Sequence, residues 1–217
     1  CGGDSDSGDG AGILCSIPWG YLDEELNLIN KQKLDRGLGM VFMPNKKEKI
    51  EECKSICEEE AEKLSVKETS WRKVPVNNEI LGPLAKANVP YICQWILYID
   101  TKDNQNIERL LFQLRKRIEK KIRETFKNDV GDCEFYFASL SSKTVVYKGM
   151  VRSEILSEFY QDLKKENFKV SFSVYHRRFS TNTLPKWPLA QPMRFLGHNG
   201  EINTLLGNIN WAKASET

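Results

Sequence analysis

Two short clusters of side chains in the last fifth of this sequence could do chemistry together. Adjacent arginines, Arg177 and Arg178, are followed by hydroxyl side chains that include Thr181, and an Asn-Gly pair, Asn199 and Gly200, comes later. An arginine guanidinium can bind a carboxylate through two parallel hydrogen bonds. An asparagine side chain beside a glycine backbone N–H can hold a developing oxyanion. The combination suits a site at which the side-chain amide of an amino acid is attacked.

The same residues also have simpler interpretations. Neighbouring residues of an extended segment point to opposite sides, so only one of Arg177 and Arg178 can face a given pocket. A surface ion pair is the alternative for either arginine. Asn199 could cap a helix that begins just after Gly200, and a helix N-terminus is itself suited to negative charge.

A glycine-rich stretch near the start of the sequence is the second candidate for a ligand contact. It is not a calcium loop, because Gly8 and Cys15 stand where oxygen ligands are required. It is not a phosphate-binding loop, because no Lys-Ser/Thr pair follows the glycines. Glycines such as Gly10 permit positive φ and close backbone approach. We therefore expect a tight turn beside a ligand, with a plain surface turn as the alternative.

The cysteines and histidines do not form a convincing metal site. Six cysteines lack the spacing of a disulfide framework. Cys53 and Cys57 are four residues apart, which suits a metal or redox pair, but they share an apolar helical stripe with Leu64, and this favours burial in a core. His176 and His198 lack further ligands for zinc, so structural hydrogen bonding is favoured. We expect no metal in this segment.

Composition points to a soluble globular protein. Apolar residues make up 40% of the 217 residues, charged residues 29%, and the formal net charge is +2. The basic stretch at residues 109–123 is interpreted as a solvated helix face, since no aromatic residues alternate with its charges as nucleic-acid binding would need. The longest apolar run, residues 92–99, is too short to span a bilayer. Neither nucleic acid nor a membrane is expected as a partner.

Hydrophobic patterning predicts a mixture of strands and helices. Strands are expected at residues 13–17, 38–43, 71–76, 91–100, 135–140, 144–147 and 172–175. Helices are expected at residues 21–34, 47–64, 107–122 and 155–163, and after Gly200. The strands at 135–140 and 144–147 flank a short turn and predict a hairpin, and Ser153 is a candidate helix cap. The irregular order indicates a layered α+β domain.

Two stretches, residues 176–194 and 196–211, closely resemble the glutamine amidotransferase domain of glutamate synthases. That domain is of the class II, N-terminal-nucleophile type. The Pro-Lys-Trp-Pro-Leu-Ala-Gln-Pro run is typical of glutamate synthases alone, whereas shorter Arg-aromatic-Ser-Thr and His-Asn-Gly pieces are shared by the wider class. Further blocks match in order at residues 7–13, 37–44, 71–77 and 144–150. Residues 1–217 are therefore interpreted as one such domain that lacks both ends.

The resemblance implies a four-layer α/β/β/α sandwich of two mostly antiparallel sheets. It also implies that L-glutamine is hydrolysed here to glutamate and ammonia. Arg178 would bind the α-carboxylate of glutamine, and Asn199 with Gly200 would form the oxyanion hole. Thr181 and Gly10 would line the pocket. Ammonia would then pass to a flavin domain of the same chain, where 2-oxoglutarate is aminated.

The resemblance also limits what this segment holds. The nucleophilic cysteine is expected upstream, because Cys1 lies too close to the glycine loop and corresponds to an internal cysteine; Cys1 is the remaining candidate within the sequence. The segment alone is then expected to be inactive. FMN, an iron–sulfur cluster and the electron donor, ferredoxin or NAD(P)H, are implied for the rest of the enzyme, in the cytoplasm or the plastid stroma. The alternatives are another class II amidotransferase and a glutamine-binding domain without a nucleophile.

Overall fold

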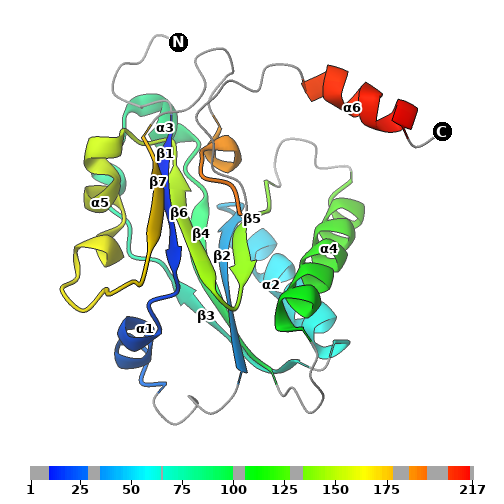
Figure 1. The fold of residues 1–217 in the computed structure, drawn as a ribbon, viewed down its shortest axis with the longest axis horizontal. Helices are drawn as coiled ribbons and strands as arrows, with labels where there is room; N and C mark the ends of the chain where they lie inside the picture. The colour runs from blue at the N-terminus through cyan, green and yellow to red at the C-terminus, as the bar shows by residue number, and fades with distance from the viewer. Residues whose placement is uncertain are drawn as a thin grey trace.

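Two antiparallel sheets form the centre of the domain (Figure 1). A computed structural model describes residues 10–28, 35–64, 66–99, 106–127, 134–177, 186–194 and 205–215. The three-stranded sheet has the order β6-β1-β7 and the four-stranded sheet the order β3-β4-β2-β5. The strands are β1 Ala11–Ser16, β2 Asp35–Met43, β3 Val66–Lys73, β4 Tyr91–Ile99, β5 Tyr136–Ser141, β6 Thr144–Gly149 and β7 Ser173–His176.

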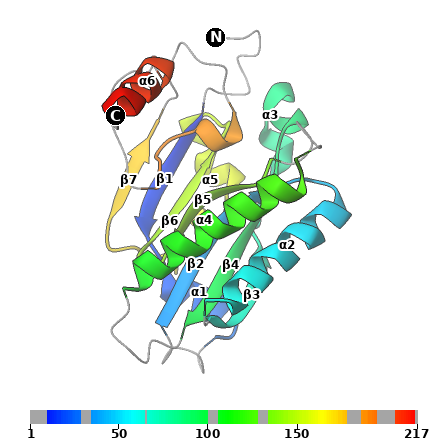
Figure 2. The same ribbon diagram turned by 90° about the vertical axis from the view of Figure 1, so that its right-hand side faces the viewer.

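Helices lie on both sides of the paired sheets (Figures 1 and 2). The α-helices are α1 Trp19–Glu25, α2 Lys47–Glu62, α3 Pro83–Ala87, α4 Ile107–Thr125, α5 Leu156–Phe159 and α6 Leu205–Ser215. Short 3-10 helices are η2 Asn78–Ile80, η3 Ser153–Ile155, η4 Gln161–Lys164 and η5 Trp187–Leu189. This arrangement confirms the predicted α+β class and agrees with an α/β/β/α sandwich. Among the described residues, no helix is long and apolar enough to cross a membrane.

Alternating residues of β2 and β4 divide the apolar side chains between two cores. Met40 and Tyr98 belong to the cluster that fills the space between the sheets, together with residues of β1 and β6. Val41, Trp95 and Leu97 belong to the cluster that packs against α2 and α4. Side chains on a strand alternate between its two faces, so each central strand contributes to both cores.

A hydrogen-bonded ion pair lies inside the core between the sheets. Arg72 of β3 donates to both carboxylate oxygens of Asp162, at 2.7 and 2.8 Å, and to the side-chain oxygen of Gln94, at 2.9 Å. The hydroxyls of Tyr21 and Tyr147 donate to the same carboxylate, at 2.8 and 3.1 Å. The network therefore joins both sheets, α1 and η4 through one buried carboxylate.

Helices α2 and α4 cover the four-stranded sheet and carry opposite charge. α2 has seven glutamates and three lysines, whereas α4 has seven lysines and arginines and three glutamates. Arg117 of α4 donates to Glu60 of α2 at 2.7 Å, and Arg115 pairs with Glu119 on its own helix. The predicted apolar stripes of both helices are buried, and Cys53 is among them. The basic stretch is therefore partly paired with glutamates instead of being wholly solvated.

Two predictions about helix length were wrong. The helix expected at residues 21–34 ends at Glu25, because Asn27 turns the chain with a left-handed φ of 54°. The helix expected at residues 155–163 is broken into η3, α5 and η4. Ser153 caps none of them with its side chain; its hydroxyl donates to Glu154.

The predicted hairpin was also wrong. β5 pairs with β2 in one sheet and β6 pairs with β1 in the other, so the turn between them links the two sheets. The Ser141 hydroxyl accepts the backbone N–H groups of Lys143 and Thr144. The Glu108 carboxylate at the start of α4 accepts hydrogen bonds from the N–H and hydroxyl of Ser142. These contacts direct the chain from one sheet to the other.

Candidate functional site

Three strand ends of the three-stranded sheet meet at one edge of the sandwich. β1 begins at Ala11, opposite Gly149 at the end of β6, and Gly12 lies opposite His176 at the end of β7. The chain therefore leaves β7 beside the point at which the glycine loop enters β1. We call this place, with Gly10, Gly12 and Gly149, the glycine edge.

The glycine edge is covered by residues 186–194, which we call the proline segment and which is orange in Figure 1. A Cβ added to Gly12 would lie 2.5 Å from the backbone oxygen of Gln191, and one added to Gly149 would lie 2.8 Å from Cε3 of Trp187. Real side chains do not tolerate such distances. The segment can thus lie on these strands only where their residues are glycines.

Gly10 needs its lack of a side chain for a second reason. Its φ is +120°, a conformation that L side chains rarely adopt, and a Cβ there would lie 3.2 Å from the Cβ of Ala190. The predicted tight turn and close approach are therefore confirmed at this residue. Its contact with a substrate remains a prediction.

Trp187 anchors the proline segment between the two sheets and α3. Its ring is 3% exposed and lies edge-on to Phe42 of β2, with the ring centroids 6.2 Å apart. Its indole N–H donates to the backbone oxygen of Ala85 at 3.3 Å. Trp187, which belongs to the Pro-Lys-Trp-Pro motif, is therefore a core residue that holds the proline segment in place.

Lys148 is a buried amine beneath the same segment. Its Nζ lies 2.8 Å from the backbone oxygen of Pro188, 3.2 Å from the hydroxyl of Tyr136 and 3.7 Å from Sδ of Met193. Burial, together with the nearby Arg194 guanidinium, lowers the pKa of Lys148 to about 7. Sequence reasoning missed this residue; the signal available was a lysine placed among valines of a buried strand.

The other end of the proline segment is held by Arg194. Its guanidinium donates to the backbone oxygen of Phe137 and lies 5.4 Å from the ring centroid of Tyr136. Nζ of Lys148 lies 4.8 Å from the same centroid. One tyrosine ring thus stands beside two cations, which is a favourable contact for each of them.

Several predicted site residues lie outside the described part of the chain. These are Cys1, Arg178, Thr181, Asn199 and Gly200. Of the predicted set, the structure places Gly10, and it places the strand β7 that leads to the Arg178 motif. The remaining assignments stay predictions.

The described cysteines are all buried, and none of them forms a disulfide: Cys15, Cys53, Cys57 and Cys93. Burial of Cys53 and Cys57 was predicted and is confirmed. Desolvation raises the pKa of Cys15 and of Cys93 to about 12 and raises that of Cys57 well above its ordinary value. Within the described ranges, no group of three His, Cys, Asp or Glu side chains could hold a metal ion.

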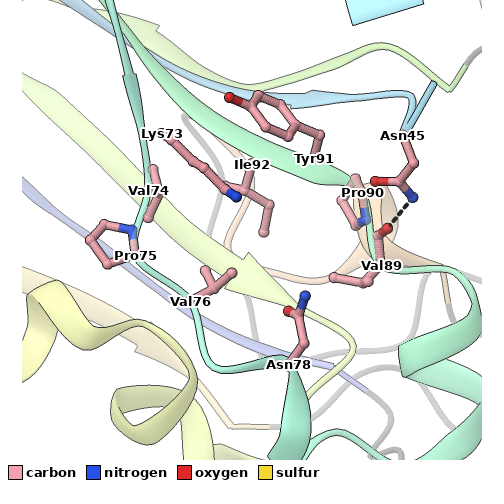
Figure 3. Close-up of a pocket in the computed structure, with 10 residues that line it drawn as sticks. All are labelled: Asn45, Lys73, Val74, Pro75, Val76, Asn78, Val89, Pro90, Tyr91 and Ile92. Atoms are coloured by element: carbon pink, nitrogen blue, oxygen red, sulfur yellow. Dashed lines mark hydrogen bonds between the residues drawn. The ribbon is translucent and has the colours of Figure 1, made fainter. Parts of the chain in front are cut away.

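A cavity of about 490 Å³ opens where β3 ends and β4 begins, and Figure 3 shows its lining. Lys73 and Tyr91 come from the two strands, and Asn78 enters from the connection between them. Asn45 closes one side by donating to the backbone oxygen of Val89 at 2.7 Å. Among the described residues that line this cavity, none belongs to the glycine edge.

Comparison with known proteins identifies the class. Residues 1–217 match the family described as class II glutamine amidotransferases, and the chain belongs to this family. It is similar to ferredoxin-dependent glutamate synthase 2 of Synechocystis, with 49% identity over 222 residues. It is also similar to the chloroplastic ferredoxin-dependent glutamate synthase of rice, with 47% identity over 220 residues, and to glutamate synthase 1 of Arabidopsis thaliana, also at 47%. All of this chain is matched, and it spans 13–14% of those relatives.

Proposed function

We propose that this chain is the glutamine-hydrolysing domain of a glutamate synthase. It would convert L-glutamine to glutamate and ammonia for the amination of 2-oxoglutarate. The observation that carries the proposal is the proline segment seated on the three glycines of the glycine edge, because this run of residues is the part of the sequence typical of glutamate synthases. The similar proteins named ferredoxin-dependent glutamate synthases support the same choice over other class II amidotransferases.

The proposed roles follow the chemistry of each group. Arg178 binds the α-carboxylate of glutamine through its planar fork. Asn199 and the N–H of Gly200 hold the oxyanion. Thr181 and the backbone near Gly10 line the pocket. The position of Gly10, at the edge where β7 ends, supports its place beside the Arg178 motif.

The nucleophile is a cysteine at a mature N-terminus, either Cys1 or one that precedes it. Its sulfur adds to the amide carbon, the α-amino group takes the thiol proton and passes it to the leaving ammonia, and water then hydrolyses the thioester. The described cysteines are poor candidates, because a buried thiol with a raised pKa supplies little thiolate.

The remaining chemistry belongs to other parts of the proposed enzyme. A flavin domain with FMN and an iron–sulfur cluster would use the ammonia. Ferredoxin is the proposed electron donor, on the strength of the relatives' names, with NAD(P)H as the other candidate. Chloroplastic relatives support the plastid stroma as the compartment, with the cytoplasm as the other candidate.

Kinetics of the full-length protein test these roles. A carboxylate clamp acts equally on ground and transition states, so Arg178→Ala should raise KM for glutamine more than it lowers kcat. Arg178→Lys should show the same defect in glutamine binding, since an ammonium lacks the planar fork of a guanidinium. Asn199→Ala should lower kcat by roughly 10²–10³ with little change in KM. Added ammonia should bypass both defects.

Two results would overturn the proposal. If the wild-type protein binds glutamine by calorimetry but releases no ammonia, the chain is a glutamine-binding domain without catalysis. If it hydrolyses glutamine but forms no second glutamate from 2-oxoglutarate with any electron donor, it serves another class II amidotransferase.

A further inference from the structure

The proline segment is attached to the glycine edge through one buried amine, for which the described residues supply no carboxylate partner. Lys148 has no exposed surface. In the described part of the chain its Nζ contacts a carbonyl, a phenol hydroxyl and a thioether, of Pro188, Tyr136 and Met193. A buried ammonium is ordinarily matched by an anion, because taking a charge out of water is costly.

Both protonation states of Lys148 can satisfy these partners. An ammonium has three N–H donors, and the three contacts supply three acceptors. A neutral amine has two N–H donors and one lone pair, which the Tyr136 hydroxyl can satisfy by turning its O–H towards Nζ. Desolvation raises the pKa of Tyr136, so the phenol keeps its proton in either case. The site therefore accepts either form without losing a hydrogen bond.

The charged groups around the amine decide which form is preferred. Arg194 of the proline segment adds a second cation at the same place. Arg115 and Glu119 of α4 act on the pKa of Tyr136 with opposite signs: Glu119 raises it and Arg115 lowers it. His176 lies in the same row of the three-stranded sheet as Lys148, on the far side of Gly12. The Tyr160 hydroxyl donates to the backbone carbonyl of Lys148, at 2.7 Å, and not to its amine.

We propose that Lys148 is a positioning residue whose protonation controls how firmly the proline segment lies on the glycine edge. Its neutral form docks the segment, whereas its ammonium form repels the Arg194 guanidinium and loosens the segment. The inference rests on the proposed function for its effect on glutamine, since the segment lies over the turn at Gly10. Its structural part stands without that function.

Limited proteolysis of the full-length protein measures docking directly. Endoproteinase Lys-C cuts after Lys186, which is exposed, but the next residue, Trp187, is buried, so cleavage requires the segment to lift. Cleavage after the exposed Lys63, on the far helical layer, normalises each digest for the protease's own pH dependence. Burial and Arg194 bring the pKa of Lys148 to about 7, so the normalised rate should fall roughly three- to tenfold between pH 6 and 8.5.

Variants separate Lys148 from its neighbours. Lys148→Met should make the normalised rate independent of pH, whereas Lys54→Met, a lysine on α2 paired with Glu51, should keep the wild-type dependence. His176→Gln should also keep it, and this result would exclude the neighbouring His176 as the source. Arg194→Gln should move the midpoint to higher pH, because one repelling cation is gone.

The outcomes decide the proposal without reference to catalysis. A wild-type rate that does not change with pH overturns it, as does a Lys148→Met rate that changes as in the wild type. If Lys148→Met does not fold, Arg194→Gln decides, and an unmoved midpoint overturns the proposal. Where glutamine hydrolysis is measurable, KM for glutamine should rise below pH 7 in the wild type and not in Lys148→Met. A protein without glutaminase activity but with the expected proteolysis refutes the proposed function alone.

Discussion

Two buried cations in this domain have opposite surroundings. Arg72, between the sheets, donates to both oxygens of the Asp162 carboxylate, whereas Lys148, at the glycine edge, meets neutral acceptors and shares its environment with Arg194. Burial lowers the pKa of both. For Arg72 the hydrogen bonds and charge of Asp162 outweigh burial and raise the pKa, whereas for Lys148 the described part of the chain supplies no carboxylate, and the pKa falls to about 7.

The difference separates a fixed part of the domain from an adjustable part. An arginine with a bidentate carboxylate stays charged at every pH the protein meets, so its network holds both sheets, α1 and η4 in one arrangement. A lysine without a carboxylate can lose its proton near neutral pH at little cost. The fixed network lies in the inter-sheet core, and the adjustable one lies where the candidate site is expected.

The largest expected effect comes from removing the carboxylate. Asp162→Asn leaves Arg72 with the more distant and half-exposed Glu25 carboxylate, at 3.7 Å, in place of its bidentate partner, and should destabilise the sandwich by about 3 kcal/mol. Hydrogen–deuterium exchange of β4 peptides in the full-length protein measures this change. Glu154→Gln is the matched control, because its pair with Arg177 is exposed to water and should contribute little to stability. Equal effects for the two variants would contradict the assignment of Asp162 as the anchor of the fixed network.

The second effect is a pH dependence with the same sign as that of paired carboxylates, but it appears at a higher pH. The folded pKa of Lys148, about 7, lies below its ordinary 10.5, so between these values the unfolded chain binds more protons. Stability should therefore rise with pH through this window, by about 1–2 kcal/mol from pH 7.5 to 9. The difference in β6 exchange between wild type and Lys148→Met at each pH isolates this contribution. A difference that stays constant with pH would show that Lys148 is charged in the folded protein.

A third effect tests the close contact beside Lys148. Gly149→Ala places a Cβ against the Trp187 ring and should destabilise the docked segment by about 1–3 kcal/mol, seen as faster cleavage after Lys186. Adding Trp187→Leu should recover part of the loss, because the two residues contact each other. Gly20→Ala is the control: nothing lies within 4 Å of its added Cβ, and alanine favours the α1 helix. If both alanines behave alike, the contact does not hold the segment.

Features set by local periodicity could be predicted from the sequence, whereas features set by single residues or distant contacts could not. The apolar stripes of α2 and α4 and the buried run of β4 follow from periodicity, because those elements bury one face or both faces against a core. The end of α1 could not be predicted, since it depends on a single left-handed residue, Asn27. The separation of β5 from β6 depends on Glu108, which is far from their turn in sequence.

The candidate site divides in the same way. The tight turn at Gly10 could be predicted because glycine permits the positive φ that such a turn needs, and Gly10 has this φ. Lys148 could not, because a strand pattern gives the face on which a residue lies but not the charge around it. Its partners Pro188 and Arg194 come from a segment some forty residues later, and only the fold brings them together.

The smallest effect is expected at the protein surface. There a third cation, Arg117, has a carboxylate partner, as Arg72 does, but it is also exposed to water. Arg117 donates to Glu60 at 2.7 Å, and its side chain is 48% exposed. Glu60 keeps a second partner, Lys63, at 2.6 Å, so Arg117→Gln leaves no unpaired carboxylate. The loss in stability should be roughly 0.5 kcal/mol and should shrink further in high salt, because exposed pairs are screened. Exchange of α2 and α4 peptides at low and high salt measures it. A loss comparable to that of Asp162→Asn would mean that pairing, and not burial, determines the strength of these networks.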